Sequence, residues 1–236
     1  SAYTNVDMAQ DEEIKCKDLN EIAPKILAQI SKKISSVLIH FSTDYVFDGN
    51  NEFGYEEDSK TNPLNVYGKY KLLGEEHIRQ TLKEHFIIRT SWVFGKNGNN
   101  FVKTMMRLFL NKESVNVVND QYGCPTSARS LAIFTRKVCQ LIIKGKNITF
   151  GTYNYTNGDK CSWFDFSSEI LNLLEDSSGP LNCKLRPVSS DQFKTKAPRP
   201  KFSILLFKKT GSIFKIKQLS WKDELKLLVE ELSNNG

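Results

Sequence analysis

Short apolar runs and longer stretches with helical spacing alternate along this chain. Apolar runs that suit buried strands occupy residues 37–41, 86–90, 115–118 and 148–155. Apolar positions that recur every three or four residues predict helices over residues 9–34, 63–83, 101–109 and 127–144. The first of these helices should be kinked at Pro24. This alternation is typical of an α/β protein in which helices cover both faces of a parallel sheet.

Turn and capping residues mark several boundaries. Residues 48–63 are rich in Gly, Asn, Asp and Pro and predict a loop. Ser162 with Asp165, and Ser220 with Asp223, have the spacing of a capping box before an apolar stripe. We therefore expect two further helices near the C-terminus. In the last one, the face toward the core should hold Trp221, Leu225, Leu228 and Leu232.

The composition is that of a globular protein of 236 residues with 39% hydrophobic and 25% charged side chains. These values exclude disordered and fibrous classes. No apolar stretch approaches the roughly 20 residues of a membrane-spanning helix, and the start does not have the pattern of a signal peptide. The net charge of +6 is spread among interspersed charges, which indicates a solvated surface and not a nucleic-acid partner.

The five cysteines are odd in number, far apart and without C-x-x-C spacing. With three scattered histidines they form no zinc pattern, so we expect no resident metal from this set. Free thiols in a reducing cytoplasm are the simplest interpretation.

One group of residues suggests chemistry. The strand at 37–41 leads into Thr43 and Asp44, and ligands of open α/β sheets bind at the carboxyl ends of strands. Tyr67 and Lys71 are four residues apart on a predicted helix, which sets both side chains on one face. A phenol beside an ammonium is a candidate general acid, because the charge should lower its pKa from about 10. Tyr-x-x-x-Lys alone is more often a surface pair; its place after the strand tip favours catalysis.

Several segments resemble the extended short-chain dehydrogenase/reductase superfamily and, within it, the dTDP-4-dehydrorhamnose reductase family. The strongest are STDYVFDG at 42–49 and PLNVYGKYKLLGE at 63–75. Further matching segments cover residues 2–7, 89–95, 100–105, 120–127 and 197–200. The resemblance spans nearly the whole chain. It implies a partial Rossmann-like parallel sheet with helices on both faces, plus a smaller C-terminal substrate-binding lobe.

The resemblance also implies roles for single residues. Tyr67 would be the proton donor, and Lys71 its electrostatic partner and a ligand of the nicotinamide ribose. Thr43 would bind near the carbonyl and tune the tyrosine. Asp44 and Trp92 would contact the deoxysugar.

The implied cofactor is NADPH or NADH, bound additionally by the loop of Ser1, Ala2 and Tyr3. Arg199 is a candidate for the diphosphate because of its fixed charge and fork of donors. Some relatives bind a divalent metal between subunits, which adds Mg²⁺ at a subunit interface and a homodimer to the expectations. The dTDP-sugar is the expected partner, with neither nucleic acid nor membrane.

The implied activity is NADPH-dependent reduction of the C4 keto group of dTDP-4-dehydro-L-rhamnose to dTDP-L-rhamnose, for cell-surface polysaccharide synthesis such as that of lipopolysaccharide. The implied domains are an NADP-binding Rossmann-like domain at 1–98, to which 128–157 returns, and a sugar-nucleotide lobe at 99–127 and 158–236. All of this is expected in the cytoplasm.

The chain departs from the family pattern in three respects. None of its 13 glycines forms the G-x-G-x-x-G type of dinucleotide fingerprint, so the first βαβ units are expected to be missing and the fragment to bind NADPH weakly and to be inactive alone. Tyr70 stands where relatives carry a small hydroxyl residue. Phe207 and Lys208 replace small or acidic residues.

Two other functions remain open at this stage. The first is a related sugar-nucleotide epimerase or dehydratase, although dehydratases place an acidic pair after the threonine and here Tyr45 follows Asp44. The second is a non-catalytic regulatory subunit of the same fold, such as that of methionine adenosyltransferase.

Overall fold

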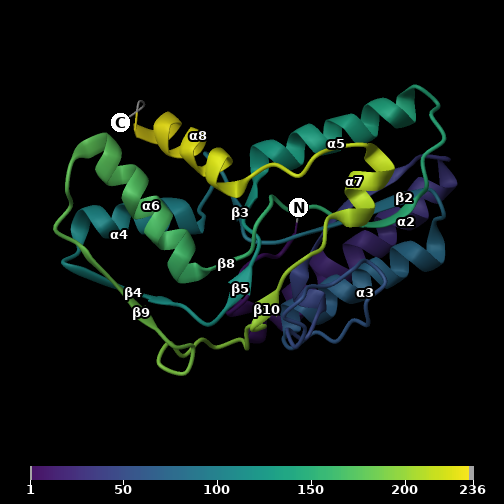
Figure 1. Ribbon diagram of the computed structural model, residues 1–236. Helices are drawn as coiled ribbons and strands as arrows, with labels where there is room; N and C mark the ends of the chain where they lie inside the picture. Colours follow the sequence, from purple (N-terminus) through teal and green to yellow (C-terminus); the bar gives the residue numbers. More distant parts are fainter. Residues whose placement is uncertain (1, 234–236) are drawn as a thin grey trace. The chain divides into compact units, whose positions relative to one another are not determined.

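The computed structural model describes residues 2–233, except for the side chain at position 178 (Figure 1). Its internal contacts divide the chain into two compact units. The first unit comprises Ser1–Thr90, Gly145–Tyr155 and Thr195–Ile216. The second unit comprises Ser91–Lys144, Thr156–Lys194 and Lys217–Gly236.

The first unit contains a parallel sheet in the order β1-β2-β7. These strands are Leu38–Thr43, His85–Thr90 and Gly151–Asn154. The central strand β2 is buried along its whole length, as expected for a strand covered on both faces. The register pairs Thr43 with Thr90, so two threonines lie side by side at the carboxyl edge of the sheet.

Two helical segments cover one face of this sheet. The first runs through α1 (Glu13–Lys17), the π-helical turn η2 (Asp18–Ile22) and α2 (Ala23–Lys33), and the second is α3 (Val66–Thr81). Both contact β1, and their shared core with the strands consists of Ala28, Ile78, Leu82 and Ile87, with Leu38 at its margin.

Where the sequence predicts a kink at Pro24, the structure has a π-helical turn, η2, that ends two residues earlier at Ile22. Proline has no N–H to donate to the carbonyl four residues earlier, which is that of Asn20. A Cβ at Gly74 of α3 would lie 2.2 Å from this carbonyl oxygen. Only glycine therefore allows the two helices to approach as closely as they do.

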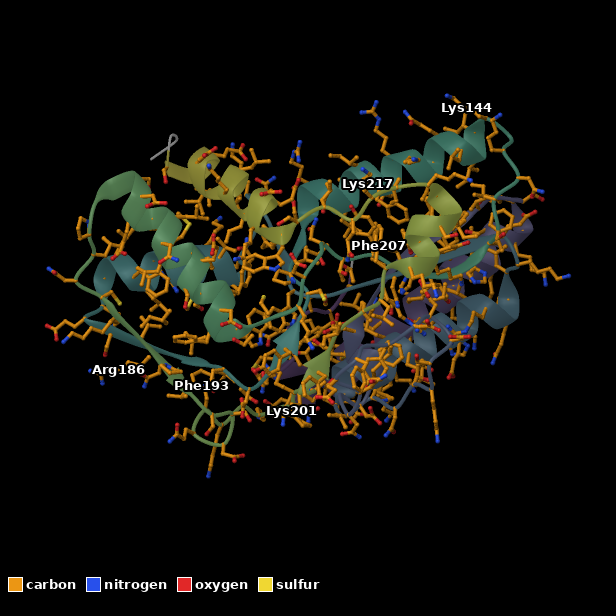
Figure 2. All side chains as sticks on the ribbon, in the orientation of Figure 1. Lys144, Arg186, Phe193, Lys201, Phe207 and Lys217 are labelled. Atoms are coloured by element: carbon orange, nitrogen blue, oxygen red, sulfur yellow. The ribbon has the colours of Figure 1, made fainter. Side chains whose placement is uncertain are left out.

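The opposite face of the sheet is covered by α7 (Lys208–Phe214), which contacts β7. Phe214 packs its ring on Tyr153 and Phe86, with centroid distances of 5.0 and 6.3 Å. Phe207, labelled in Figure 2 at the start of α7, packs on Tyr155 at 5.7 Å. The large side chain at this position is thus part of the aromatic packing under α7. Lys208 is exposed.

Short elements complete the first unit. They are the 3₁₀ turns η1 (Met8–Gln10) and η3 (Asp44–Val46) and the strand β10 (Phe202–Ser203).

The second unit is built around α4 (Phe101–Asn111), α6 (Trp163–Ser178) and α8 (Trp221–Ser233). A parallel pair of strands, β4 (Ser114–Val118) and β9 (Lys184–Val188), joins this core. The unit also contains α5 (Ala128–Ile143) and the two-residue strands β3 (Val93–Phe94), β5 (Tyr122–Gly123), β6 (Thr126–Ser127) and β8 (Cys161–Ser162).

Of the two predicted capping boxes, the one at α6 is present and the one at α8 is replaced by a different hydrogen bond. Ser162 and Asp165 form the predicted capping box of α6. Before α8, the Ser220 hydroxyl instead accepts a hydrogen bond from the N–H of Lys222 at 3.2 Å. The expected stripe of α8 is confirmed, because Trp221, Leu225 and Leu228 are buried and Leu232 packs against the same core.

The predicted α/β class with a parallel sheet and helices on both faces is confirmed. The bounds of the compact units differ from the expected domain bounds, since residues 128–144 group with the second unit and 195–216 with the first. Which unit binds the cofactor and which the sugar nucleotide stays a prediction.

Candidate active site

The carboxyl end of β1 carries two buried polar residues, Thr43 and Asp44, which are 4% and 2% exposed. Thr43 has an extended backbone and caps η3, because its hydroxyl accepts the N–H of Tyr45 at 3.2 Å. The same hydroxyl donates to Oδ1 of Asp44 at 2.9 Å. The strand therefore ends in a fixed hydroxyl with a carboxyl group beside it.

Helix α3 brings Tyr67 to this hydroxyl. Asn65 caps the helix by accepting the N–H of Gly68 at 2.8 Å. A Cβ at Gly68 would lie 2.2 Å from the carbonyl oxygen of Tyr45, so glycine lets the first turn of α3 approach η3 closely. The phenol of Tyr67 lies near the side chain of Thr43, and its ring meets that of Tyr45 edge-on at 5.7 Å.

Lys71 lies one turn further along α3 and is 3% exposed. Its Nζ donates to the carbonyl oxygen of Phe41 at 2.6 Å and lies 3.3 Å from Nε2 of His40. Four residues of helix rise about 6 Å and two residues of strand about 6.6 Å. Tyr67 and Lys71 can therefore contact the same strand at Thr43 and Phe41. The structure brings together three of the predicted catalytic residues, Thr43, Tyr67 and Lys71, along β1.

The acid–base properties of this group differ in one respect from the expectation. Burial raises the pKa of Tyr67, and the nearby Asp44 carboxylate reinforces this shift, while the hydrogen bond with Thr43 opposes it. The expected lowering of the Tyr67 pKa by Lys71 is therefore wrong for this structure. Burial lowers the pKa of Lys71 to about 8, although the negative charge of Glu75 favours its protonated form.

His40 and Asp44 are also shifted by burial. Burial and the charge of Lys71 lower the pKa of His40 to about 3, which leaves the imidazole neutral at pH 7. Burial raises the pKa of Asp44 to about 6, against hydrogen bonds from Ser203 and Thr43 that favour its ionised form. Perturbed groups of this kind gather at functional sites.

A buried ion pair lies behind Lys71. Glu75 is fully buried and accepts two hydrogen bonds from Arg89 of β2, from Nε at 2.9 Å and from Nη2 at 2.7 Å. Arg79 adds a third at 2.8 Å. Burial raises the pKa of Glu75, but the charges and hydrogen bonds of these guanidinium groups outweigh it and lower the pKa to about 2. The pair fixes α3 to β2.

Sequence reasoning missed Glu75, His40 and Ser203. Glu75 had a signal, since it follows Lys71 by one helical turn on the same face. His40 and Ser203 gave none, because their contacts depend on how the chain folds back.

Trp92, the predicted sugar contact, belongs to the second unit. It has a left-handed backbone with φ of 49°. Its ring stacks on that of Trp163 with centroids 3.4 Å apart and an interplanar angle of 8°. The indole is half-buried.

The loop expected to contact the cofactor consists of Ser1, Ala2 and Tyr3, the first three residues of the chain. Ser1 lies outside the described residues, and Ala2 is exposed. Tyr3 is buried, exchanges two hydrogen bonds between its backbone and the Asn20 amide, and donates its hydroxyl to Glu12. Burial and this contact raise the pKa of Tyr3 to about 12.

Arg199, the candidate diphosphate ligand, is engaged elsewhere in the first unit. Its guanidinium donates to both carboxylate oxygens of Asp7, at 3.1 and 2.7 Å, and to the carbonyl of Ala197 at 2.8 Å. A carboxylate thus occupies the fork of donors of Arg199 and ties residues 197–199 to the N-terminal loop. The role of Arg199 toward the diphosphate stays a prediction.

Tyr70, which departs from the family pattern, also has a structural explanation. Its ring packs with Tyr3, Ala9 and Cys16, and its hydroxyl donates to Glu13 at 2.5 Å. The larger residue thus joins α3 to α1.

The described residues contain no group of three or more His, Cys, Asp or Glu side chains arranged to hold a metal ion. No helix within residues 2–233 is long and apolar enough to cross a membrane. All five cysteines are free thiols.

The carboxyl edge of the sheet fits the nicotinamide end of a dinucleotide. An ammonium has three N–H donors, and Lys71 directs two of its donors at Phe41 and His40, which leaves one for a ribose hydroxyl. The hydroxyl of Thr90, paired in register with Thr43, is buried and has no hydrogen-bond partner among the described residues. A ligand that offers hydroxyl and amide groups would satisfy both.

Comparison with known families gives one match over almost the whole chain. The family model described as the RmlD substrate binding domain matches residues 1–234.

Curated proteins of similar sequence agree. The chain is 36% identical over 234 residues to the spore coat polysaccharide biosynthesis protein SpsK of Bacillus subtilis strain 168, covering 99% of this chain and 78% of that protein. It is 34% identical over 233 residues to the dTDP-4-dehydrorhamnose reductase of Escherichia coli K12, covering 98% and 78%.

Solved structures are similar too. The dTDP-4-dehydrorhamnose reductase of Bacillus anthracis strain Ames in complex with NADP superposes with a TM-score of 0.89 at 35% identity, over 98% of this chain and 78% of that one. The corresponding enzyme of Clostridium acetobutylicum gives 0.88 at 34% identity, over 98% and 79%. A dTDP-glucose 4,6-dehydratase of Streptomyces venezuelae shares the fold alone, at 16% identity.

Proposed function

The chain belongs to the family of the RmlD substrate binding domain, and we propose that it is a dTDP-4-dehydrorhamnose reductase. The reaction is the reduction of the C4 keto group of dTDP-4-dehydro-L-rhamnose to dTDP-L-rhamnose, with NADPH as the hydride donor. Relatives of that name at 33–36% identity support the reaction, and an NADP complex of one structural neighbour supports the cofactor. The observation that carries the proposal is the row of Thr43, Tyr67 and Lys71 along β1 within this family.

Bound NADPH supplies the hydride that adds to C4. Tyr67 donates its phenolic proton to the oxygen that becomes negative during this addition. The raised pKa of Tyr67 suits this direction of the reaction, since the group must be protonated before each turnover. An alkoxide is a stronger base than a phenolate, so the transfer is downhill.

Lys71 and Thr43 stabilise Tyr67 after the transfer. With a pKa of about 8, Lys71 is mostly protonated at pH 7, and its charge favours the phenolate that forms one helical turn away. Thr43 lies near the phenol, and its side chain favours the ionised form of Tyr67. Lys71, Tyr67 and the loop with Ala2 and Tyr3 are the proposed cofactor contacts, and Asp44 and Trp92 the proposed contacts of the deoxysugar.

The proposal extends to the surroundings of the enzyme. The five free thiols support a reducing compartment such as the cytoplasm. A homodimer, with Mg²⁺ between its subunits, is the proposed assembly and rests on the family resemblance alone.

The test is substrate-dependent oxidation of NADPH by the purified full-length protein. We expect Tyr67→Phe to lower kcat by about 10²–10⁴-fold, which is the range for a lost general acid. Tyr70→Phe is the matched control, because Tyr70 is on the same helix but bonds to Glu13, and it should retain activity. A full-length wild-type protein without this oxidation, or a full-length Tyr67→Phe variant as active as wild type, would refute the proposal. Mass and NMR analysis of the product separates reduction from loss of water or epimerisation.

A further inference from the structure

The backbone of Trp92 adopts a conformation that a bulky residue rarely takes. Its φ of 49° lies in the left-handed region, where the Cβ of an L-residue is crowded by the backbone. Such conformations persist only where the surroundings enforce them, and they gather at functional sites. Trp92 therefore needs a structural explanation.

Both sides of Trp92 are fastened to one neighbouring segment. The hydroxyl of Ser91 donates to the carbonyl of Cys124 at 2.6 Å. The carbonyl of Trp92 accepts the N–H of Thr126 at 3.2 Å, and Val93 pairs with Thr126 between β3 and β6. These bonds hold the backbone of Trp92 in the left-handed region.

The indole of Trp92 is fixed as well. It stacks on Trp163 at 3.4 Å between centroids. Trp163 is the first residue of α6, directly after the capping-box residue Ser162, and Phe101 packs on it at 4.5 Å. The partner ring is thus set by a helix start and has little freedom of its own.

Gly123 provides the space for this indole. A Cβ at position 123 would lie 2.5, 2.7 and 2.8 Å from the Cε2, Cζ2 and Nε1 atoms of Trp92. Gly123 is not among the described residues with a positive φ, so its backbone conformation does not demand glycine. The close approach of the Trp92 ring does.

The fixed ring is nevertheless partly exposed. Trp92 is half-buried, and its indole N–H makes no hydrogen bond within the described part of the chain. Trp221, in contrast, is 2% exposed and lies in the core of the same unit. The N–H at the edge of a partly exposed indole can donate a hydrogen bond to an oxygen of a pyranose ring.

We propose that Trp163 and Gly123 are positioning residues that hold the indole of Trp92 for contact with the deoxysugar of the substrate. This rests on the proposed function. The two residues act through Trp92, by the stack and by the space left for it. Binding of the sugar therefore depends on the strained backbone of Trp92 and on the two residues that support its indole.

The experiment compares steady-state kinetics of Trp163→Leu, Gly123→Ala and Trp163→Phe with wild type. Loss of the stack or insertion of a Cβ should raise KM for the dTDP-sugar by about tenfold, the upper range for one aromatic pair. KM for NADPH should stay within about twofold, and Trp163→Phe should recover most of the loss because it keeps an aromatic ring.

Trp221→Phe is the matched control, since it alters a core tryptophan of the same unit. It should lower Tm without changing KM for the sugar. If Trp163→Leu and Gly123→Ala lower Tm in the same way and leave KM unchanged, the positioning role is wrong. A circular dichroism couplet from the stacked pair should be present in wild type and Trp221→Phe and absent from Trp163→Leu.

Equilibrium binding of dTDP-L-rhamnose, followed by tryptophan fluorescence, provides a measurement that needs no turnover. Trp163→Leu and Gly123→Ala should raise its Kd by about tenfold, and an unchanged Kd overturns the inference. A full-length wild-type protein that fails to oxidise NADPH would contradict the proposed function, and the comparison of Kd values would still decide the roles of Trp163 and Gly123.

Discussion

The ammonium of Lys71 lies 3.3 Å from Nε2 of His40. With a pKa of about 3, His40 is neutral at pH 7, so its Nε2 lone pair accepts a hydrogen bond from Lys71 and its proton resides on Nδ1. The imidazole therefore favours the charged form of a lysine that burial otherwise discourages.

His40→Leu should consequently lower the pKa of Lys71 below its value of about 8. Protonated Lys71 is the active form, and activity is lost as pH rises through its pKa. Without the acceptor, the alkaline limb of kcat/KM should move to lower pH by roughly one unit, as expected for one hydrogen bond to a charged group. His40→Gln, which retains an acceptor, should stay near wild type. A limb that does not move in His40→Leu would contradict this role of His40.

Asp44 should make stability depend on pH. Its pKa is raised to about 6 in the folded state, against about 3.9 in an unfolded chain. The folded protein therefore binds this proton more tightly, and the stabilisation, present below about pH 4, is lost as pH rises through about 6. Between these two pH values the free energy of unfolding of wild type should fall by roughly 2–3 kcal/mol relative to that of Asp44→Asn, as measured by urea unfolding.

The comparison with Asp44→Asn removes the contributions of other groups, including Glu75, whose lowered pKa acts below this window. Asp191→Asn, at an exposed position, is the control and should run parallel to wild type. A constant difference between wild type and Asp44→Asn from about pH 4 to about pH 7 would show that the carboxyl is not shifted in this way.

Removal of the negative charge of Glu75 should lower the free energy of unfolding. Arg89 is 2% exposed, and Glu75→Gln would leave its guanidinium buried without a counter-charge. Breaking one partner of a buried pair typically costs about 3–5 kcal/mol in the free energy of unfolding. Glu231→Gln breaks an exposed pair with Lys96 and should cost less than about 1 kcal/mol. Urea unfolding at neutral pH measures both, and equal losses would count against the importance of burial.

The main elements and the Tyr67–Lys71 pair follow from local patterns in the sequence. Period and spacing determine which residues share a helix face, so α3 and its two functional side chains were predictable. Strand β9 could not be predicted, because Pro187 argues against a strand. The proline is tolerated here because β9 belongs to a sheet of only two strands. The pKa of Tyr67 could not be predicted either, since burial depends on tertiary packing.

The substitution Gly74→Ala tests how closely α3 approaches the backbone of Asn20. From intrinsic propensity alone, Gly74→Ala should stabilise α3 by about 1 kcal/mol. A Cβ there would lie 2.2 Å from the backbone oxygen of Asn20, and backbone cannot yield as a flexible side chain does. We therefore expect the opposite sign, a loss of about 1–3 kcal/mol in the free energy of unfolding.

Gly158→Ala is the matched control for Gly74→Ala. Position 158 has no positive φ, and the nearest atom to an added Cβ lies 3.5 Å away, an ordinary contact. It should change stability by less than about 0.5 kcal/mol. Because Asn20 also holds the backbone of Tyr3, Gly74→Ala should in addition increase amide exchange at Tyr3. Stabilisation by Gly74→Ala would mean that η2 and α3 are not in contact at this point.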